Sequence, residues 1–185
     1  MRDITGQVEQ LLDRQAIRDC VYRYARAIDR HDTELLESCY HADAIDDHGS
    51  YVGSARGLAE TTQALHEGFL RTQHHMTNHF VDLQGSTAHA ETYYLVAVRD
   101  KAGPTSLVSG RYVDRFEKRN GDWRIAARVT LCETVVEAPT GAVMEQLDQV
   151  FAPGSRDRSD ISYQRPLQVA RRSAEEPHPA PATAH

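Results

Sequence analysis

The strongest constraint on the fold of this chain is a change of pattern near residue 70. Before it, apolar side chains recur at spacings of three and four, which is typical of amphipathic helices. After it, long segments rich in Val, Thr, Tyr and Phe are separated by turn residues, which is typical of strands. Because the strands do not alternate with helices, the sequence predicts an α+β fold with a strongly curved, mostly antiparallel sheet rather than a parallel one.

The N-terminal part is expected to contain helices, and the first is the longest. Its apolar face runs from Val8 to Ile28, Asp32 can cap a short second helix, and residues 57–70 form a third. The predicted strands are residues 44–51, 74–83, 88–99, 107–118 and 123–136. Asn120-Gly121 favours a hairpin with positive φ between the last two. A curved sheet wrapped over the first helix would enclose a ligand pocket.

The length of 185 residues suits one domain. We interpret residues 1–152 as the folded domain and residues 153–170 as an ordered extension, because the latter keep a few apolar side chains among polar ones. Residues 171–185 are rich in proline and nearly free of apolar side chains, which predicts a disordered tail.

The composition excludes several classes of partner. A net charge of -6 provides no basic surface for nucleic acid or for an anionic membrane. No apolar run is long enough to span a bilayer or to act as a secretory signal, so a cytoplasmic location is expected. The widely spaced Cys20, Cys39 and Cys132 are expected to be buried thiols rather than disulfides or zinc ligands.

Three side chains are candidates for acid, base or anion-binding roles, and each also has a purely structural interpretation. Asp29 lies where the first helix ends, and the helix dipole disfavours its charge; it is either a solvated turn residue or a functional acid. Tyr24, on the core face of that helix, is either a hydrogen-bonded core residue or an acid catalyst. Arg128, in the last strand, is either an exposed edge charge or an inward-pointing anion ligand.

The histidines at 74, 75 and 79 raise the question of a metal site. Neighbouring strand residues point to opposite faces, and His75 and His79 would lie about 13 Å apart on one face. The chain also has no zinc-type spacing, no glycine-rich phosphate loop and no nucleophile motif. We therefore expect neither a metal nor a cofactor, which leaves acid–base chemistry.

Some short motifs resemble a known family. They are Tyr24-Ala-Arg-Ala-Ile-Asp29, Thr72-Gln-His74-His-Met-Thr-Asn78, and Asn120-Gly-Asp-Trp123 followed by Arg128. Together they resemble the SnoaL-like branch of the nuclear-transport-factor-2-like (NTF2-like) superfamily, over roughly residues 7–139. This branch includes scytalone dehydratase, hexachlorocyclohexane dehydrochlorinase and bile-acid 7α-dehydratase. The resemblance implies a cone-shaped barrel with a deep apolar pocket.

The same resemblance implies an Asp29–His74 catalytic dyad, with Tyr24 and Arg128 as further site residues. The expected function is a cofactor-free lyase acting on a lipophilic cyclic substrate such as a steroid, terpenoid or polyketide. His74 would remove a proton from the substrate, and Asp29 would orient the imidazole of His74. Tyr24 and Arg128 would stabilise the leaving oxygen or an oxyanion.

Other functions remain open at this point. An isomerase or cyclase would use the same groups, and a non-catalytic ligand-binding protein or the small subunit of a ring-hydroxylating dioxygenase would share the fold. A homo-oligomer is expected, because the outer face of the sheet has no helices over it and its strands carry apolar residues at both parities. The family resemblance implies a trimer rather than a dimer.

Overall fold

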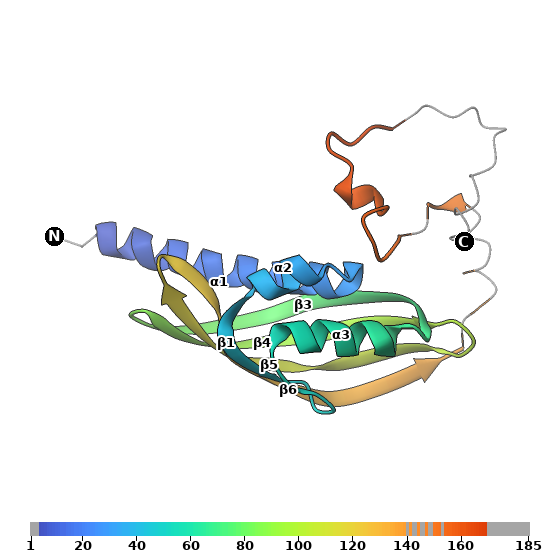
Figure 1. The fold of residues 1–185 in the computed structure, drawn as a ribbon, viewed down its shortest axis with the longest axis horizontal. Helices are drawn as coiled ribbons and strands as arrows, with labels where there is room; N and C mark the ends of the chain where they lie inside the picture. Colours follow the sequence, from blue (N-terminus) through green and yellow to red (C-terminus); the bar gives the residue numbers. More distant parts are fainter. Residues whose placement is uncertain are drawn as a thin grey trace.

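The computed structural model describes residues 4–139, 141, 144, 147, 150–152 and 154–169, so the predicted tail at 171–185 lies outside the described residues. Helices come before the long strands, as predicted (Figure 1). The helices are α1 (Ile4–Arg30), α2 (Thr33–Ser38) and α3 (Ala55–His66). The strands are β1 (Tyr40–Asp47), β2 (Val52–Gly53), β3 (Phe69–Gln84), β4 (Thr87–Asp100), β5 (Thr105–Arg119) and β6 (Asp122–Ala138), and a 3-10 turn follows at Ile161–Tyr163.

The described strands form one six-stranded sheet in the order β2-β1-β6-β5-β4-β3. β1 and β6 are parallel, and the other neighbours are antiparallel. Helix α1 contacts both β3 and β6, although β4 and β5 lie between these two strands in the sheet. The sheet must therefore curl around the helix, as Figure 1 shows. The α+β class and the curved sheet are confirmed, but the barrel is not closed, because β2 and β3 are edge strands.

Irregularities in strand pairing contribute to this curvature. The register shifts between Met76 and His79 in β3 and between Ser109 and Gly110 in β5, and such bulges bend a strand and increase its twist. A Cβ atom at Gly110 would collide with the carbonyl oxygen of Leu131 and lie 2.6 Å from the hydroxyl of Tyr94. Glycine is therefore required where β5 and β6 approach each other most closely.

The core lies between α1 and the concave face of the sheet. Alternate residues of β4 are buried there, in keeping with the two-residue period of a strand. They face buried residues of α1 from Ile17 onward. The two-residue turn between β5 and β6, Asn120-Gly121, has φ of 53° and 89°, which confirms the predicted hairpin.

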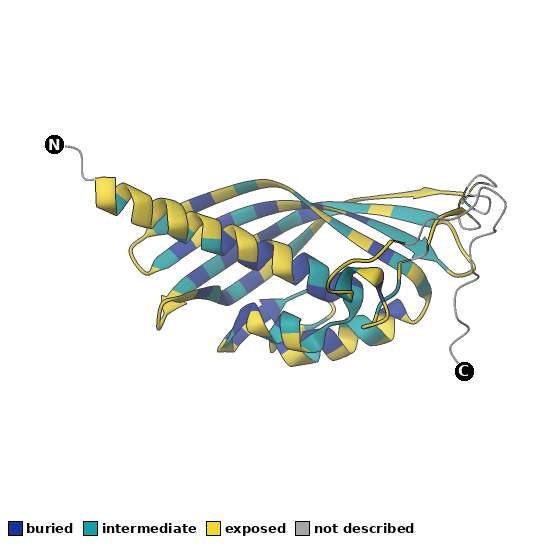
Figure 2. Cartoon of the chain, turned by 90° about the horizontal axis from the view of Figure 1, so that it is seen from above, coloured by how far each residue is buried: buried dark blue, intermediate teal, exposed yellow. Residues whose placement is uncertain are grey.

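The N-terminal part of α1 differs from the prediction. Its apolar face was expected to be buried from Val8 onward, yet Val8 and Leu11 are 48% and 66% exposed. Figure 2 shows this part of the helix exposed and projecting past the sheet. The pattern correctly predicts the helix, but the sheet ends before the helix does, so the first buried residue is Ile17.

The cysteines also differ in part from the prediction. Cys20 and Cys39 are buried, but Cys132 is exposed. It belongs to the last third of β6, where every residue from 132 to 138 is exposed because no other described element covers this part of the strand. None of the helices in the described part of the chain is long and apolar enough to cross a membrane.

The described part of the C-terminal extension, residues 154–169, lies against the C-terminal end of α1. Arg26 Nη1 donates to Ser162 Oγ at 3.0 Å, and the Tyr163 hydroxyl donates to Asp32 Oδ2 at 2.8 Å. The extension therefore covers the end of the helix that carries Asp29.

Candidate functional site

Asp29 is fixed in space by the way α1 ends. The amide of Asp32 donates to Ala27 O at 3.0 Å and that of His31 to Ile28 O at 3.3 Å, while His31 has a φ of +50°. This is a Schellman arrangement with histidine in place of the usual glycine. It stops the helix directly after Asp29 and Arg30, so the Asp29 carboxylate projects from the last turn with only 8% of the residue exposed.

His74 lies on β3, which is an edge strand, so one side of its backbone has no neighbouring strand. The backbone N–H of His74, which has no partner in a neighbouring strand, instead donates a hydrogen bond to Asp29 Oδ2 at 2.8 Å. The imidazole bonds to the other carboxylate oxygen, with Nδ1 and Oδ1 2.7 Å apart. The two residues are therefore joined by two hydrogen bonds, and the predicted contact is present.

This double contact determines which imidazole nitrogen can act as a base. An ionised carboxylate only accepts hydrogen bonds, so Nδ1 must carry the hydrogen that is shared with Asp29. In the neutral ring, Nε2 then has the free lone pair, and no hydrogen bond within the described part of the chain occupies it. The side chains of His74 and Asp29 are 9% and 11% exposed, so the pair is shielded but reachable.

A cavity of about 340 Å³ adjoins the pair on the side of α1 and β3. Its wall combines apolar and charged or polar groups: Tyr22, Ala25 and Met76 together with Arg26, Asp29, Arg30, Gln73 and His74. A small molecule bound there would place apolar atoms against Met76 while it meets the imidazole.

The other histidines of β3 lie apart from this pair. His75 is exposed on the opposite face, as the strand period predicts. His79 was expected on the face of His75, but it is half-buried and its Nδ1 lies 2.8 Å from Thr92 Oγ1. The bulge between Met76 and His79 changes the alternation and turns His79 inward. Among the described residues, no group of three His, Cys, Asp or Glu side chains could hold a metal ion.

Arg128 points inward and is bound by a carboxylate. Its Nε and Nη2 donate to the two oxygens of Asp114 at 2.7 and 2.8 Å, and both side chains are 0% exposed. The guanidinium carbon lies 4.1 Å from the ring centroids of both Tyr24 and Tyr112. Arg128 is therefore a fully engaged core cation, held by an ion pair and by two aromatic faces.

Tyr24 belongs to the same buried cluster. Burial raises its pKa well above the usual value for tyrosine, and the charge of Arg128 only partly offsets this, so the hydroxyl stays protonated. No hydrogen bond, ion pair or ring contact within the described part of the chain joins Tyr24 or Arg128 to Asp29 or His74. The structure thus places the four predicted site residues in two separate pairs, and a role for Tyr24 or Arg128 in chemistry stays a prediction.

A second histidine–carboxylate pair escaped the sequence reasoning. His48 Nδ1 lies 3.0 Å from Asp46 Oδ1, and the Tyr40 hydroxyl donates to Asp46 Oδ2 at 2.6 Å. Burial alone would raise the pKa of Asp46, but the hydrogen bond from His48 and the charge of Arg128 lower it. The available signal was the spacing of two between Asp46 and His48 within the predicted strand 44–51.

His31 and His66 form another contact that the sequence did not indicate. His31 Nε2 and His66 Nδ1 lie 3.2 Å apart, at the ends of α1 and α3. Burial, together with the neighbouring side chains of His31 and Arg156, lowers the pKa of His66 to about 3. This contact joins residues 35 positions apart and has no local motif.

Solved structures with a similar fold support the architecture. LinA, a hexachlorocyclohexane dehydrochlorinase, superimposes with a TM-score of 0.69 and 20% identity, covering 80% of this chain and 98% of that chain. A candidate scytalone dehydratase from Novosphingobium aromaticivorans gives a TM-score of 0.63 at 20% identity, covering 72% of this chain and 92% of that chain. A variant of Rv3472, a protein of unknown function from Mycobacterium tuberculosis, gives 0.61 at 27% identity, covering 68% of this chain and 74% of that chain.

Sequence comparison provides the family. No curated protein matches the chain significantly. The model of the SnoaL-like domain matches residues 9–129, which is more than half of the chain and includes Asp29, His74 and the whole of the sheet as far as Val129. The chain therefore belongs to the SnoaL-like domain family.

Proposed function

We propose that this protein is a cofactor-free lyase that eliminates a small leaving group from a lipophilic cyclic substrate, with His74 as the base. The observation that carries the proposal is the pair of hydrogen bonds between Asp29 and His74, at 2.7 and 2.8 Å. The family and the presence of a dehydrochlorinase and a candidate dehydratase among the similar structures support the reaction class.

The reaction needs one base and a shielded site. Nε2 of His74 takes a proton from carbon, the electrons of that C–H bond form the new double bond, and the leaving group departs with its own electron pair. Asp29 holds the ring in one orientation and stabilises the imidazolium that forms. The low exposure of both side chains strengthens this electrostatic interaction.

An isomerase or cyclase would use the same base and return the proton to another atom. Product analysis separates these outcomes, because only elimination lowers the mass of the organic product. A ligand-binding protein or a dioxygenase small subunit has no need of an imidazole clamped by two hydrogen bonds beside a cavity. The likeness to a candidate aromatic ring hydroxylase from Novosphingobium aromaticivorans, at 23% identity and a TM-score of 0.62, concerns the fold alone.

The test compares variants on a panel of cyclic alcohols and halides, with products identified by mass spectrometry. Once a substrate is found, His74→Ala and Asp29→Asn should each lower kcat by about two to four orders of magnitude. His75→Ala is the matched control, because it removes the same side chain one residue away, on the opposite face of β3.

Two results would contradict the proposal. If His74→Ala kept the kcat of His75→Ala, His74 would not be the base. If no member of the panel lost water or hydrogen halide while several compounds bound with unchanged mass, the protein would be a binding protein.

A further inference from the structure

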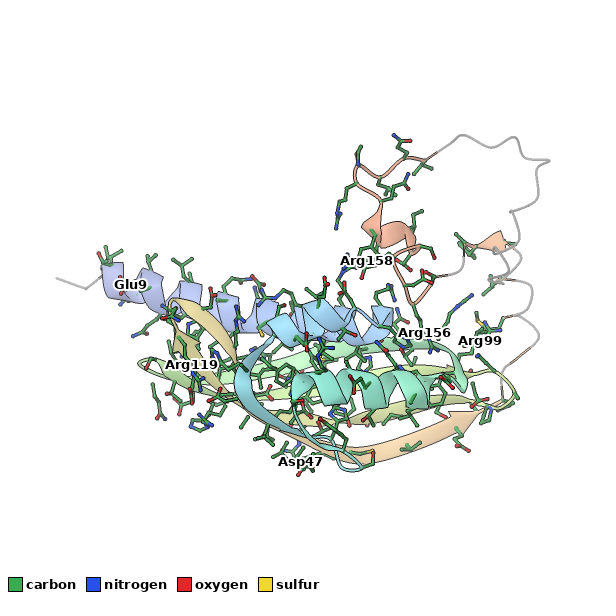
Figure 3. All side chains as sticks on the ribbon, viewed as in Figure 1. Glu9, Asp47, Arg99, Arg119, Arg156 and Arg158 are labelled. Carbon is green, nitrogen blue, oxygen red and sulfur yellow. The ribbon has the colours of Figure 1, made fainter. Side chains whose placement is uncertain are left out.

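A second cavity, of about 390 Å³, lies next to Asp29 and is bordered on one side by the C-terminal extension. Among its described lining residues, four are arginines: Arg30 from α1, Arg71 from β3, Arg99 from β4 and Arg156 from the extension. Figure 3 shows Arg99 and Arg156 at the same end of the molecule. Cations from four segments far apart in the sequence thus surround one cavity.

The described wall of this cavity carries little negative charge to set against its arginines. Asp29 is the only carboxylate among the described residues that line the cavity. Both of its oxygens accept hydrogen bonds from His74, one from the ring and one from the backbone. One carboxylate therefore faces four arginines among the described lining residues, and no ion pair between Asp29 and Arg156 is formed within the described part of the chain.

Arg156 has no carboxylate within ion-pair distance in the described part of the chain. Its Nη1 donates to His66 O at 2.7 Å and its Nη2 to Phe69 O at 2.6 Å, and both acceptors are neutral carbonyl groups. Its Nε is buried and has no hydrogen-bond partner in the described part of the chain. Burial lowers the pKa of Arg156, and the charge of Asp29 only partly offsets this. By contrast, Arg30 has an ion pair, with its Nε 3.4 Å from Asp160 Oδ1.

A simpler role for Arg156 is to anchor the extension, because His66 is the last residue of α3 and an arginine there satisfies a terminal carbonyl. That role uses two of the donors and does not explain the buried Nε of Arg156, which lies at a cavity lined by three further arginines. A guanidinium group binds carboxylate and phosphate oxygens through two parallel hydrogen bonds.

We propose that this cavity is a subsite for an anionic oxygen group, a carboxylate or a phosphate, with Arg156 as its principal ligand. The identification of that anion as part of the substrate rests on the proposed function, whereas the binding of the anion does not. If the anion is part of the substrate, the substrate is a lipophilic cyclic acid or phosphate. The charged end of the substrate then lies in this cavity, and the reacting carbon meets His74 on the other side of Asp29.

The experiment measures the binding of three small probes by calorimetry at low ionic strength. Benzoate and phenyl phosphate carry the two anions, and benzamide is the neutral analogue of benzoate. We expect at least one anion to bind about tenfold or more tightly than benzamide, the size of one charge-assisted hydrogen bond. A preference for benzoate or for phenyl phosphate identifies which of the two anions the cavity takes.

Arg156→Met should weaken binding of the preferred anion by about tenfold. Arg158→Met is the matched control: it lies two residues away in the same extension, its side chain is 68% exposed and it does not line this cavity. The affinity of the Arg158→Met variant for the preferred anion should stay within about twofold of the wild type. Arg156→Lys keeps a cation but not the two parallel hydrogen bonds of the guanidinium, so it should recover part of the affinity that Arg156→Met loses.

The proposal is overturned if benzamide binds as tightly as both anions, or if Arg156→Met and Arg158→Met have the same affinity. It is also overturned if Arg156→Lys binds no better than Arg156→Met, because the role of Arg156 would then be structural. These binding measurements need no turnover, so a failed subsite and a failed lyase assignment are recognised separately.

Discussion

Replacing Arg128 by methionine should strongly destabilise the fold, because it removes one partner of a fully buried ion pair. Asp114 would keep its charge at a site with 0% side-chain exposure, and two bonds of 2.7 and 2.8 Å would be lost. Breaking a buried pair from one side costs about 3–5 kcal/mol, most of it the cost of leaving the other charge uncompensated. In a chain of this size that corresponds to a fall in Tm of about 6–20 °C.

Denaturant unfolding followed by fluorescence measures this cost directly. Trp123 is the single tryptophan of the chain and is 3% exposed, so its emission reports loss of the core. Arg124→Met is the matched control on the same strand, since Arg124 and its partner Asp122 are 38% and 70% exposed. Exposed pairs of this kind contribute about 0–1 kcal/mol.

A double variant tests the explanation itself. Arg128→Met combined with Asp114→Leu removes both charges and should recover most of the lost free energy of unfolding. If Arg128→Met unfolded at the same denaturant concentration as Arg124→Met, the reasoning would be refuted. A loss of turnover without a loss of stability would instead favour the catalytic role that the family resemblance implies for Arg128.

Three further predictions concern acid stability, the sheet and assembly. Burial holds the pKa of His66 at about 3, below its ordinary 6.5, so between these pH values the unfolded state binds more protons than the folded state. The free energy of unfolding should therefore decrease as the pH is lowered through this range, by up to about 1.4 kcal/mol per pH unit. His66→Gln should make this decrease smaller in urea titrations at pH 4–6.5. Gly110→Ala should cost about 1–3 kcal/mol in the same assay, because its Cβ meets Leu131 O. Sedimentation should give an oligomer, since large apolar residues of β4 to β6, among them Leu95 and Val129, are 37–55% exposed, and the family resemblance predicts a trimer; a single-chain mass would contradict this.

The sequence predicts well those features that depend on local chemistry. The α1 periodicity, the Asp32 cap and the Asn120-Gly121 hairpin all depend on neighbouring residues, and the structure has them. The contact between Asp29 and His74 spans 45 positions and was reached only through the family resemblance.

Other features depend on the partner that an element meets, which no local pattern contains. The apolar face of α1 has the same period where the sheet covers it and where the sheet has ended, so the exposure of Leu11 could not be predicted. Small apolar residues on both faces of β6 left the direction of Arg128 open, and its partner Asp114 comes from the neighbouring strand. The face of His79 depends on a bulge that the sequence does not mark.

Asp29 forms part of the wall of both cavities, so one substitution should change catalysis and recognition in opposite directions. Asp29→Asn keeps the shape of the side chain but removes the charge that stabilises the imidazolium of His74, so kcat falls. The same change removes the only described carboxylate beside the arginine-lined cavity, so an anion bound there loses a repulsive neighbour. Benzoate or phenyl phosphate, whichever binds the wild type better, should therefore bind Asp29→Asn about three- to tenfold more tightly, which corresponds to a charge interaction of about 1 kcal/mol. Calorimetry that showed weaker anion binding in this variant would mean that Asp29 does not face the anion, and the two cavities would then have to be treated as independent sites.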